Sequence, residues 1–262
     1  MRLFYYNLID NAKPLGTIPF NNFFYSTQQA YLPAENVADK QRKRPWRTTV
    51  DFGEEWVYFD FGQPQTAQAI IILDHTLKAT DYGIKIQAST IPNFDSPPAP
   101  FSQDITWSPG VITHTFAAQT YRYWRWIFQK DVGATTRDIG RLFIGPYVDA
   151  PMPDWGGWER DEEDLTPVLR TKDGQIFKDA GNSFRIANLS FTDMTNTHKE
   201  QFRALMDHVG IHTPFFAVID PTGAGEVAET MYVRLRQMPR LRVTGFDDGH
   251  LWSGRVEIEE LL

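Results

Sequence analysis

Hydrophobic and polar residues alternate in short segments along the first 150 residues. Tyr82, Ile84 and Ile86 are separated by glycine and lysine, the pattern of a strand with one buried and one solvated face. Similar segments, bounded by Gly, Pro, Asp or Asn, occupy residues 56–61, 69–73, 82–89, 111–116, 121–128 and 142–144. Several short strands at this spacing, without helical periodicity, predict a β-sandwich.

The pattern changes to a helical period in the last third of the chain. Phe202, Leu205 and Val209 lie at positions i, i+3 and i+7, which predicts a helix over residues 193–209 with Thr197 in a capping box at its start. Strands are expected around this helix at residues 183–191, 213–220, 231–237 and 251–261.

Proline, glycine and acidic residues mark a boundary near the middle of the chain. Residues 145–158 contain several Pro and Gly residues and precede an acidic run at 161–164, a composition typical of a domain boundary. We therefore expect a mainly β fold: a β-sandwich jelly roll over 1–149, a linker over 150–164, and a β-barrel or sandwich domain with one packed α-helix over 165–262.

Charge is distributed unevenly between the two halves. Residues 1–150 contain 14 Lys and Arg and 14 Asp and Glu, whereas residues 151–262 contain 12 and 19, so the net charge of −7 lies in the second half. Sequence-specific nucleic-acid binding needs a basic face and is not expected. No apolar run reaches the roughly 20 residues that span a bilayer, and the first ten residues lack a secretory layout. We expect synthesis in a cytoplasm and no membrane insertion.

Six segments across the first domain resemble, in order, the discoidin or coagulation factor 5/8 type C family, which is galactose-binding-like. They are NLID at 7–10, YLPAENVAD at 31–39, VYFDFG at 57–62, YGIKIQAS at 82–89, YRYWRW at 121–126 and IGRLFIG at 139–145. The terminal Cys pair of animal members is missing, and Arg141 stands where an acidic residue is common. The resemblance implies a jelly roll that binds glycans, lipid head groups or protein surfaces through loops at one end.

The second domain resembles the ring-forming tail-tube and tail-tip proteins of long-tailed bacteriophages. The resemblance lies in the order of strand, helix and three strands, in PFFAVIDP at 214–221 and in the closing LWSGRVEIEEL at 251–261. It implies assembly into a ring around a channel, with neighbouring copies joined through sheets and a packed helix. It also implies a location in the virion, at the tail tip.

Candidate ligand-binding residues in the first domain are aromatic and polar side chains in expected loops. They are Phe23, Phe24, Tyr25, Arg42 and His75. Aromatic faces beside such donors suit a sugar, whose C–H face stacks while its hydroxyls form hydrogen bonds. The alternative is structural, since such rings often plug the end of a barrel and a basic turn is often only solvated.

Residues with catalytic or metal-binding spacing are scarce. His208 and His212 are four apart, but Gly210 ends the helix between them and spoils the geometry of a zinc pair. The sequence contains no nucleophile elbow and no Cys. We therefore predict no catalytic residues, no enzymatic activity, no metal and no cofactor.

These patterns leave two main functions open. The first is a structural protein of a bacteriophage tail tip, whose partners are its own copies in a ring and other tail proteins. Its discoidin-like domain would contact host-surface glycans or neighbouring tail proteins. The alternative is a stand-alone bacterial carbohydrate-binding module protein, which a monomer in solution would favour. A small hydrolase is a third hypothesis, with turnover abolished by one carboxylate substitution as its signature.

Overall fold

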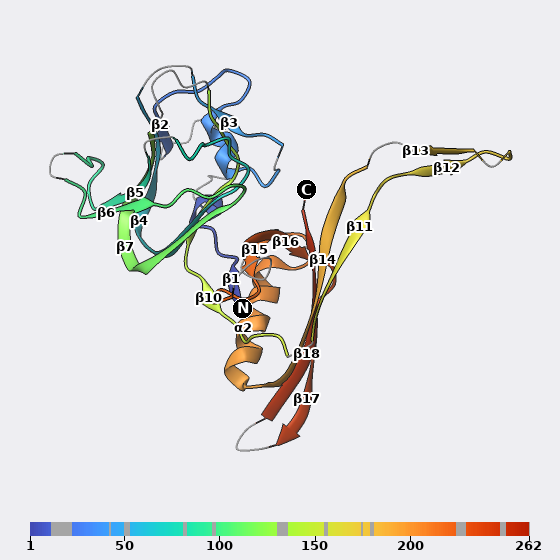
Figure 1. Ribbon diagram of the computed structural model, residues 1–262. Helices are drawn as coiled ribbons and strands as arrows, with labels where there is room; N and C mark the ends of the chain where they lie inside the picture. Colours follow the sequence, from blue (N-terminus) through green and yellow to red (C-terminus); the bar gives the residue numbers. More distant parts are fainter. Residues whose placement is uncertain are drawn as a thin grey trace. The chain divides into compact units, whose positions relative to one another are not determined.

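The computed structural model describes residues 1–262 except 12–22, 42, 50–52, 81–82, 96–97, 130–135, 155–156, 174, 179–180, 224–228, 247–249 and 262. The chain forms two compact units (Figure 1). We call Tyr6–Pro146 the inserted unit, and Met1–Tyr5 together with Tyr147–Leu262 the split unit. The expected mainly β fold with one packed helix is confirmed.

The boundaries between the units differ from those that we expected. Strand β1 (Arg2–Phe4) pairs with β10 (Val148–Asp149) and with β15 (Phe215–Val218), so both ends of the expected first domain belong to the split unit. The expected linker contains β11 (Trp158–Asp164), which pairs along its whole length with β14 (Ser183–Met194). Only the first residue of β11 packs against the core, and most of its other side chains are exposed charges. Its sequence therefore lacks the alternation that marks a strand.

Two long strands, β4 (Glu54–Ile72) and β7 (Ile112–Gln129), organise the inserted unit. They pair at both ends, and irregularities near the middle shift the register. At one end β2 (Phe23–Tyr25) and β5 (Gly83–Ser89) flank the pair, and at the other end β9 (Leu142–Gly145) joins β4. Inward side chains from both ends belong to one core cluster. The two ends therefore face each other as the layers of a sandwich.

The expected strands of the inserted unit are present, but they are joined differently. Residues 56–61 and 69–73 fall largely in β4, and residues 111–116 and 121–128 fall largely in β7. Strand β6 (Phe101–Ile105) is absent from the expectation because its central residues are polar. The short remaining elements are α1 (Leu8–Asn11), the 3-10 turn η1 (Ala34–Ala38), β3 (Trp46–Arg47) and β8 (Asp138–Ile139).

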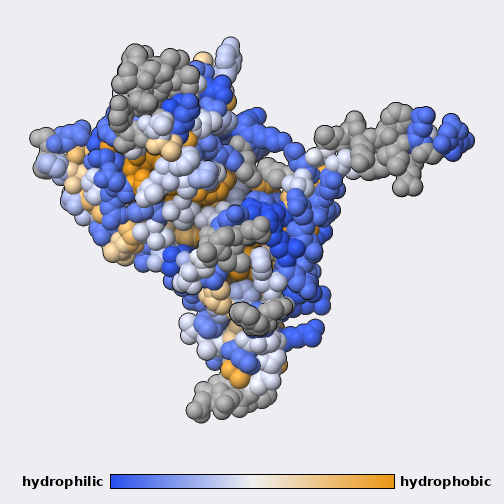
Figure 2. Space-filling view, viewed as in Figure 1, coloured by the Kyte–Doolittle hydropathy of each residue, from blue (hydrophilic) through white to orange (hydrophobic). Residues whose placement is uncertain are grey.

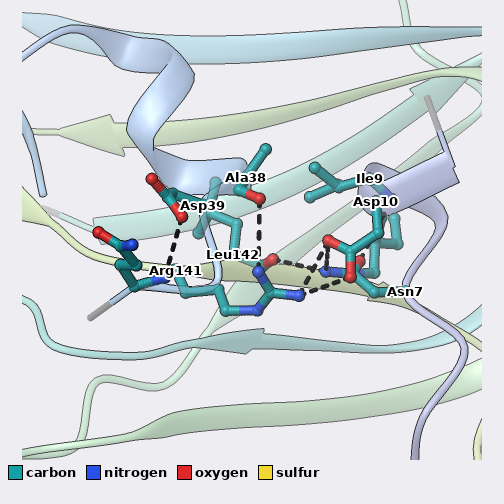
Figure 3. A network of polar contacts seen from close by, with 9 residues as sticks. Asn7, Ile9, Asp10, Ala38, Asp39, Arg141 and Leu142 are labelled. Atoms are coloured by element: carbon teal, nitrogen blue, oxygen red, sulfur yellow. Dashed lines mark hydrogen bonds and ion pairs between the residues drawn. The ribbon is translucent and has the colours of Figure 1, made fainter. Parts of the chain in front are cut away.

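A buried polar network joins the first and last segments of the inserted unit (Figure 3). The Asn7 amide donates to the carbonyl of Leu142 at 3.0 Å, and its side-chain oxygen accepts the backbone N–H of Ile144 at 3.2 Å. Arg141 is 3% exposed, and its guanidinium donates to both carboxylate oxygens of Asp10 at 2.7 and 2.9 Å. A buried arginine at this position thus needs a carboxylate opposite, and α1 supplies it through Asp10, which is partly buried.

The split unit contains an open antiparallel sheet with the strand order β10-β1-β15-β16-β18-β14-β11, and β17 also pairs with β18. The strands not yet given are β16 (Met231–Leu235), β17 (Arg240–Phe246) and β18 (His250–Glu260), while β12 (Val168–Arg170) and β13 (Ile176–Lys178) form a separate pair. Strand β17 is absent from the expectation because arginines at alternate positions make it polar. Strands β10 and β11 stand at the two ends of the described sheet order.

Helix α2 (Asn196–Val209) packs its apolar stripe against this sheet. Phe202, Leu205 and Val209 are buried in one cluster with inward residues of β14 and β18. The capping residue is Thr195, whose hydroxyl accepts the N–H of His198, rather than the expected Thr197. Both threonines precede the same apolar stripe, and the chain enters the helix at the earlier one.

Candidate functional site

Strand β2 presents two candidate aromatic residues to opposite faces of the inserted unit. Phe24 is 44% exposed, and its ring stacks on Tyr58 with centroids 4.6 Å apart and planes at 18°. Tyr25 instead packs against the core. Neighbouring residues of a strand point to opposite sides, so Phe24 and Tyr25 do not contribute to one binding surface.

The exposed ring of Phe24 belongs to a row of aromatic side chains on the outer face of the sheet. Tyr58 lies opposite Phe24 in the β2–β4 register and also stacks on Trp56, with centroids 5.7 Å apart. We call Phe24, Tyr58 and Trp56 the aromatic row. Burial, Asp60 and Tyr123 raise the pKa of Tyr58. Its hydroxyl therefore stays protonated at neutral pH and able to donate a hydrogen bond.

A fixed arginine lies across the sheet from the middle of the row. Arg125 stands opposite Tyr58 in the β4–β7 register, and its guanidinium lies 4.6 Å from the ring centre of Phe94. It donates to the side-chain oxygen of Gln87 at 2.6 and 3.0 Å and to the carboxylate of Asp95 at 2.9 Å. The face beside the row thus combines ring surfaces with fixed polar groups.

A buried carboxylate positions the end of β2. Glu55 is 2% exposed and accepts hydrogen bonds from the hydroxyls of Ser26 and Thr27. The backbone N–H of Ser26 also donates to the carbonyl of Trp56 at 2.9 Å. These contacts fix the strand that carries Phe24 without using any atom of the exposed ring.

Three candidate residues remain: Phe23, Arg42 and His75. Phe23 lies in β2, and Arg42 lies outside the described residues. His75 forms a bridge with Ile139 and is not part of the aromatic row. Both ring nitrogens are shielded from solvent, and no described residue forms a hydrogen bond of normal geometry with either of them. Burial lowers the pKa of His75, partly offset by the backbone of Ser108 and by Asp74.

Trp56, Tyr58 and Arg125 are absent from the sequence-based candidates. Trp56 and Tyr58 can be identified from their alternation with buried residues, because Val57 and Phe59 of the same strand lie in the core. Alternate residues then face outwards, where two large aromatic side chains are unusual on an otherwise polar face. Arg125 has no such signal, since only the register brings it opposite Tyr58.

A second candidate site lies on the split unit, on the face of the sheet opposite α2. A pocket of about 590 Å³ is lined by residues of β14, β17 and β18, together with the turn before β17. Arg240 lies directly opposite Arg255, and Arg242 opposite Ser253, in the β17–β18 register. We call Arg240, Arg242 and Arg255 the arginine pocket. Among the described residues, none of the three guanidinium groups has a hydrogen-bonding or ion-pair partner.

Neighbouring arginines of the same sheet are paired. Arg234 binds Glu259, and Arg236 binds Glu257 at 3.3 Å. The hydroxyls of Ser190 and Ser253 also line the arginine pocket, whereas the Thr192 hydroxyl donates to Asp154 at 3.0 Å. The pocket is therefore chemically suited to an anion, and the carboxylates of Glu257 and Glu259 on β18 are already engaged by Arg236 and Arg234.

The described ranges lack a metal cluster and a membrane-spanning helix. They contain no group of three or more His, Cys, Asp or Glu residues arranged to hold a metal ion. No helix in the same ranges is both long and apolar enough to cross a membrane.

Comparison with known proteins finds similar structures for about half of the chain. No family model matches the sequence, and no curated protein matches it. Chitosan-binding module 1 from a Paenibacillus sp. IK-5 chitosanase/glucanase is 18% identical, covers 53% of this chain and 98% of its own, and has a TM-score of 0.40. A Streptococcus pneumoniae fucose-binding module is 12% identical over 53% of this chain and 96% of its own, with a TM-score of 0.40. The lectin domain of lectinolysin, complexed with Lewis B antigen, is 10% identical over 54% and 96%, also with 0.40.

Proposed function

We propose that this chain is a non-enzymatic binding protein whose inserted unit binds carbohydrate at the aromatic row. The observation that carries this is the stack of Phe24 on Tyr58 and Trp56, with the Phe24 ring 44% exposed. An apolar ring held in water is available for the C–H face of a sugar. The Tyr58 hydroxyl and the amide of Gln87 supply donors for sugar hydroxyls on the same face.

Substitution of the exposed ring tests this function. Phe24→Ala should weaken binding of the full chain to its glycan about tenfold, because loss of one aromatic contact removes about 1–1.5 kcal/mol. Chitosan oligomers and fucose-containing oligosaccharides are the first probes, with affinity measured by calorimetry. The melting temperature should change little, since the ring does not enter the core.

Tyr31 provides the matched control. It is 96% exposed in a loop, where the family resemblance implies that ligands bind. Tyr31→Ala should leave affinity unchanged if the aromatic row is the site. Loss of binding in Tyr31→Ala, with normal binding in Phe24→Ala, would move the site to that loop.

We propose, as a second function, that the split unit assembles copies of the chain into a ring at the distal end of a phage tail. This is favoured by the open sheet, whose edge strand β11 carries exposed carboxylates and, among the described residues, pairs with β14 alone. Figure 2 supports the same point, because the flank that carries β11 in Figure 1 is mainly hydrophilic. An unpaired, charged edge is compatible with solubility before assembly and with strand contacts after it.

Particle mass and symmetry distinguish this role from the stand-alone module. Light scattering and electron microscopy of the full chain should detect a closed ring of several copies. A monomer at every concentration tested would instead favour the carbohydrate-binding module protein. Neither result bears on glycan binding by the aromatic row, which the affinity measurements test separately.

A further inference from the structure

The arginine pocket concentrates positive charge where the sheet gives it no compensation. Arg240 and Arg255 lie directly opposite each other on neighbouring strands, and like charges in that arrangement are destabilising. No carboxylate of the described chain pairs with either of them or with Arg242. The arrangement is understandable if an anion from outside the chain binds among the three guanidinium groups, which suit carboxylates in geometry and charge.

Two carboxylates at the far edge of the same sheet are equally uncompensated. Glu159 and Asp161 of β11 are exposed and form no ion pair or hydrogen bond with the described residues. Glu163 of the same strand, by contrast, lies 3.6 Å from Arg236. Residues 159 and 161 share a face because they are two apart on a strand. Strand β11 thus presents two carboxylates without a partner on an edge that no other described strand covers.

We propose that the arginine pocket binds Glu159 and Asp161 of β11 from a second copy of this chain. The contact joins two different surfaces, so it is head-to-tail and repeats from copy to copy. It presupposes the assembly role proposed above and identifies the residues that form the interface. Edge strand β11 supplies main-chain groups for pairing, while its carboxylates set the position of the strand in the pocket.

Charge favours a copy of this chain over a nucleic acid or another polyanion. The split unit carries 13 Lys and Arg against 20 Asp and Glu, a net charge of −7. A long polyanion meets repulsion from this unit as a whole. A short acidic strand needs only local complementarity, and β11 is present in every copy at the same concentration as the pocket.

Charge reversal on each side of the interface tests the proposal with the full chain. The first variant is Arg240→Glu with Arg242→Glu and Arg255→Glu, and the second is Glu159→Arg with Asp161→Arg. The matched control reverses three exposed cations elsewhere, Lys43→Glu, Arg44→Glu and Arg203→Glu, and changes the net charge as much as the first variant. Mass is measured by light scattering over a concentration series in 0.15 M NaCl, with circular dichroism to verify folding.

Each interface variant alone should associate at least tenfold more weakly than the wild type, while the control associates normally. An equimolar mixture of the two variants should recover association, because each then offers the surface that its partner lost. Normal association of the first variant, or a folded mixture that stays monomeric, would overturn this interface while leaving assembly intact. A wild-type chain that is monomeric at all concentrations would overturn both this interface and the assembly role. The same conclusion would hold if the pocket of that monomer bound heparin, used as a polyanion probe.

Discussion

Three arginines of the inserted unit and the three of the arginine pocket lie in opposite electrostatic settings. In the inserted unit, Arg47 and Arg122 each bind both oxygens of one carboxylate, on Asp138 and Asp60, and Arg141 does the same in the core. In the split unit, the arginine pocket has no such partner among the described residues, although this unit holds the excess of acidic residues. Overall charge therefore does not determine whether an arginine is paired.

The difference separates arginines that stabilise the fold from arginines that do not. A buried pair resists disruption because removal of one partner leaves the other charge desolvated. Unpaired arginines on an exposed face contribute no such energy, and Arg240 opposite Arg255 opposes folding slightly. Substitutions in the two groups should therefore change the free energy of unfolding by different amounts and in opposite directions.

Loss of the buried guanidinium should have the largest effect. Arg141→Ala leaves the partly buried Asp10 carboxylate without its partner and should lower the free energy of unfolding by about 3–5 kcal/mol. Urea denaturation of the full chain, followed by tryptophan fluorescence, measures this because Trp46, Trp124 and Trp126 are all in the core of the inserted unit.

Arg141→Lys is the control for charge alone. It keeps the positive charge but loses the two-pronged contact, so it should retain part of the stability. A loss below 1 kcal/mol in Arg141→Ala would contradict the assignment of Arg141 to the stabilising group.

A smaller, pH-dependent effect is expected from His75, a largely buried polar side chain of the inserted unit. Because burial lowers its pKa below 6.5 in the folded chain, the unfolded chain binds the proton more readily. Stability should therefore fall as pH decreases from 7 through 6.5 towards the folded pKa. His75→Gln should flatten this slope in unfolding curves at pH 7.5 and 5.5, with the contribution of His114 common to both proteins. Parallel slopes would show that His75 is not the titrating group.

The smallest effect, and one of opposite sign, is expected in the arginine pocket. Arg255→Thr removes the like charge opposite Arg240 and introduces a residue that favours strands. The free energy of unfolding should rise by about 0.2–1 kcal/mol, measured at protein concentrations low enough to keep the chain monomeric. A decrease of more than 1 kcal/mol would mean that Arg255 stabilises its own chain, and the contrast between the units would disappear.

The sequence predicted what depends on local periodicity and missed what depends on pairing. Helix α2 and strand β18 followed from apolar spacing, because each buries one regular face. Strand β11 was missed because its charges are exposed at an edge, where no alternation is needed. The opposite orientations of Phe24 and Tyr25 were missed because both residues were assigned to a loop, where successive side chains do not alternate between two faces.

The candidate site shows the same division. Phe24 was found from its residue type, whereas its partners in the aromatic row required the β2–β4 register. The arginine pocket required the register of β17 and β18 and knowledge of which carboxylates were already engaged. These are long-range properties that residue spacing does not encode.

The pairing of β1 with β15 affects the order in which the chain can fold during synthesis. Arg2 lies opposite Val218, so the first strand leaves the ribosome more than two hundred residues before its partner. The inserted unit, which is contiguous, can close its own core during that interval. Until β15 emerges, β1 can pair on one edge with β10, and its other edge lacks the partner strand that it has in the folded chain. Early folding of the inserted unit shortens the loop that β1 must close, since its ends at Tyr6 and Pro146 are then fixed rather than free.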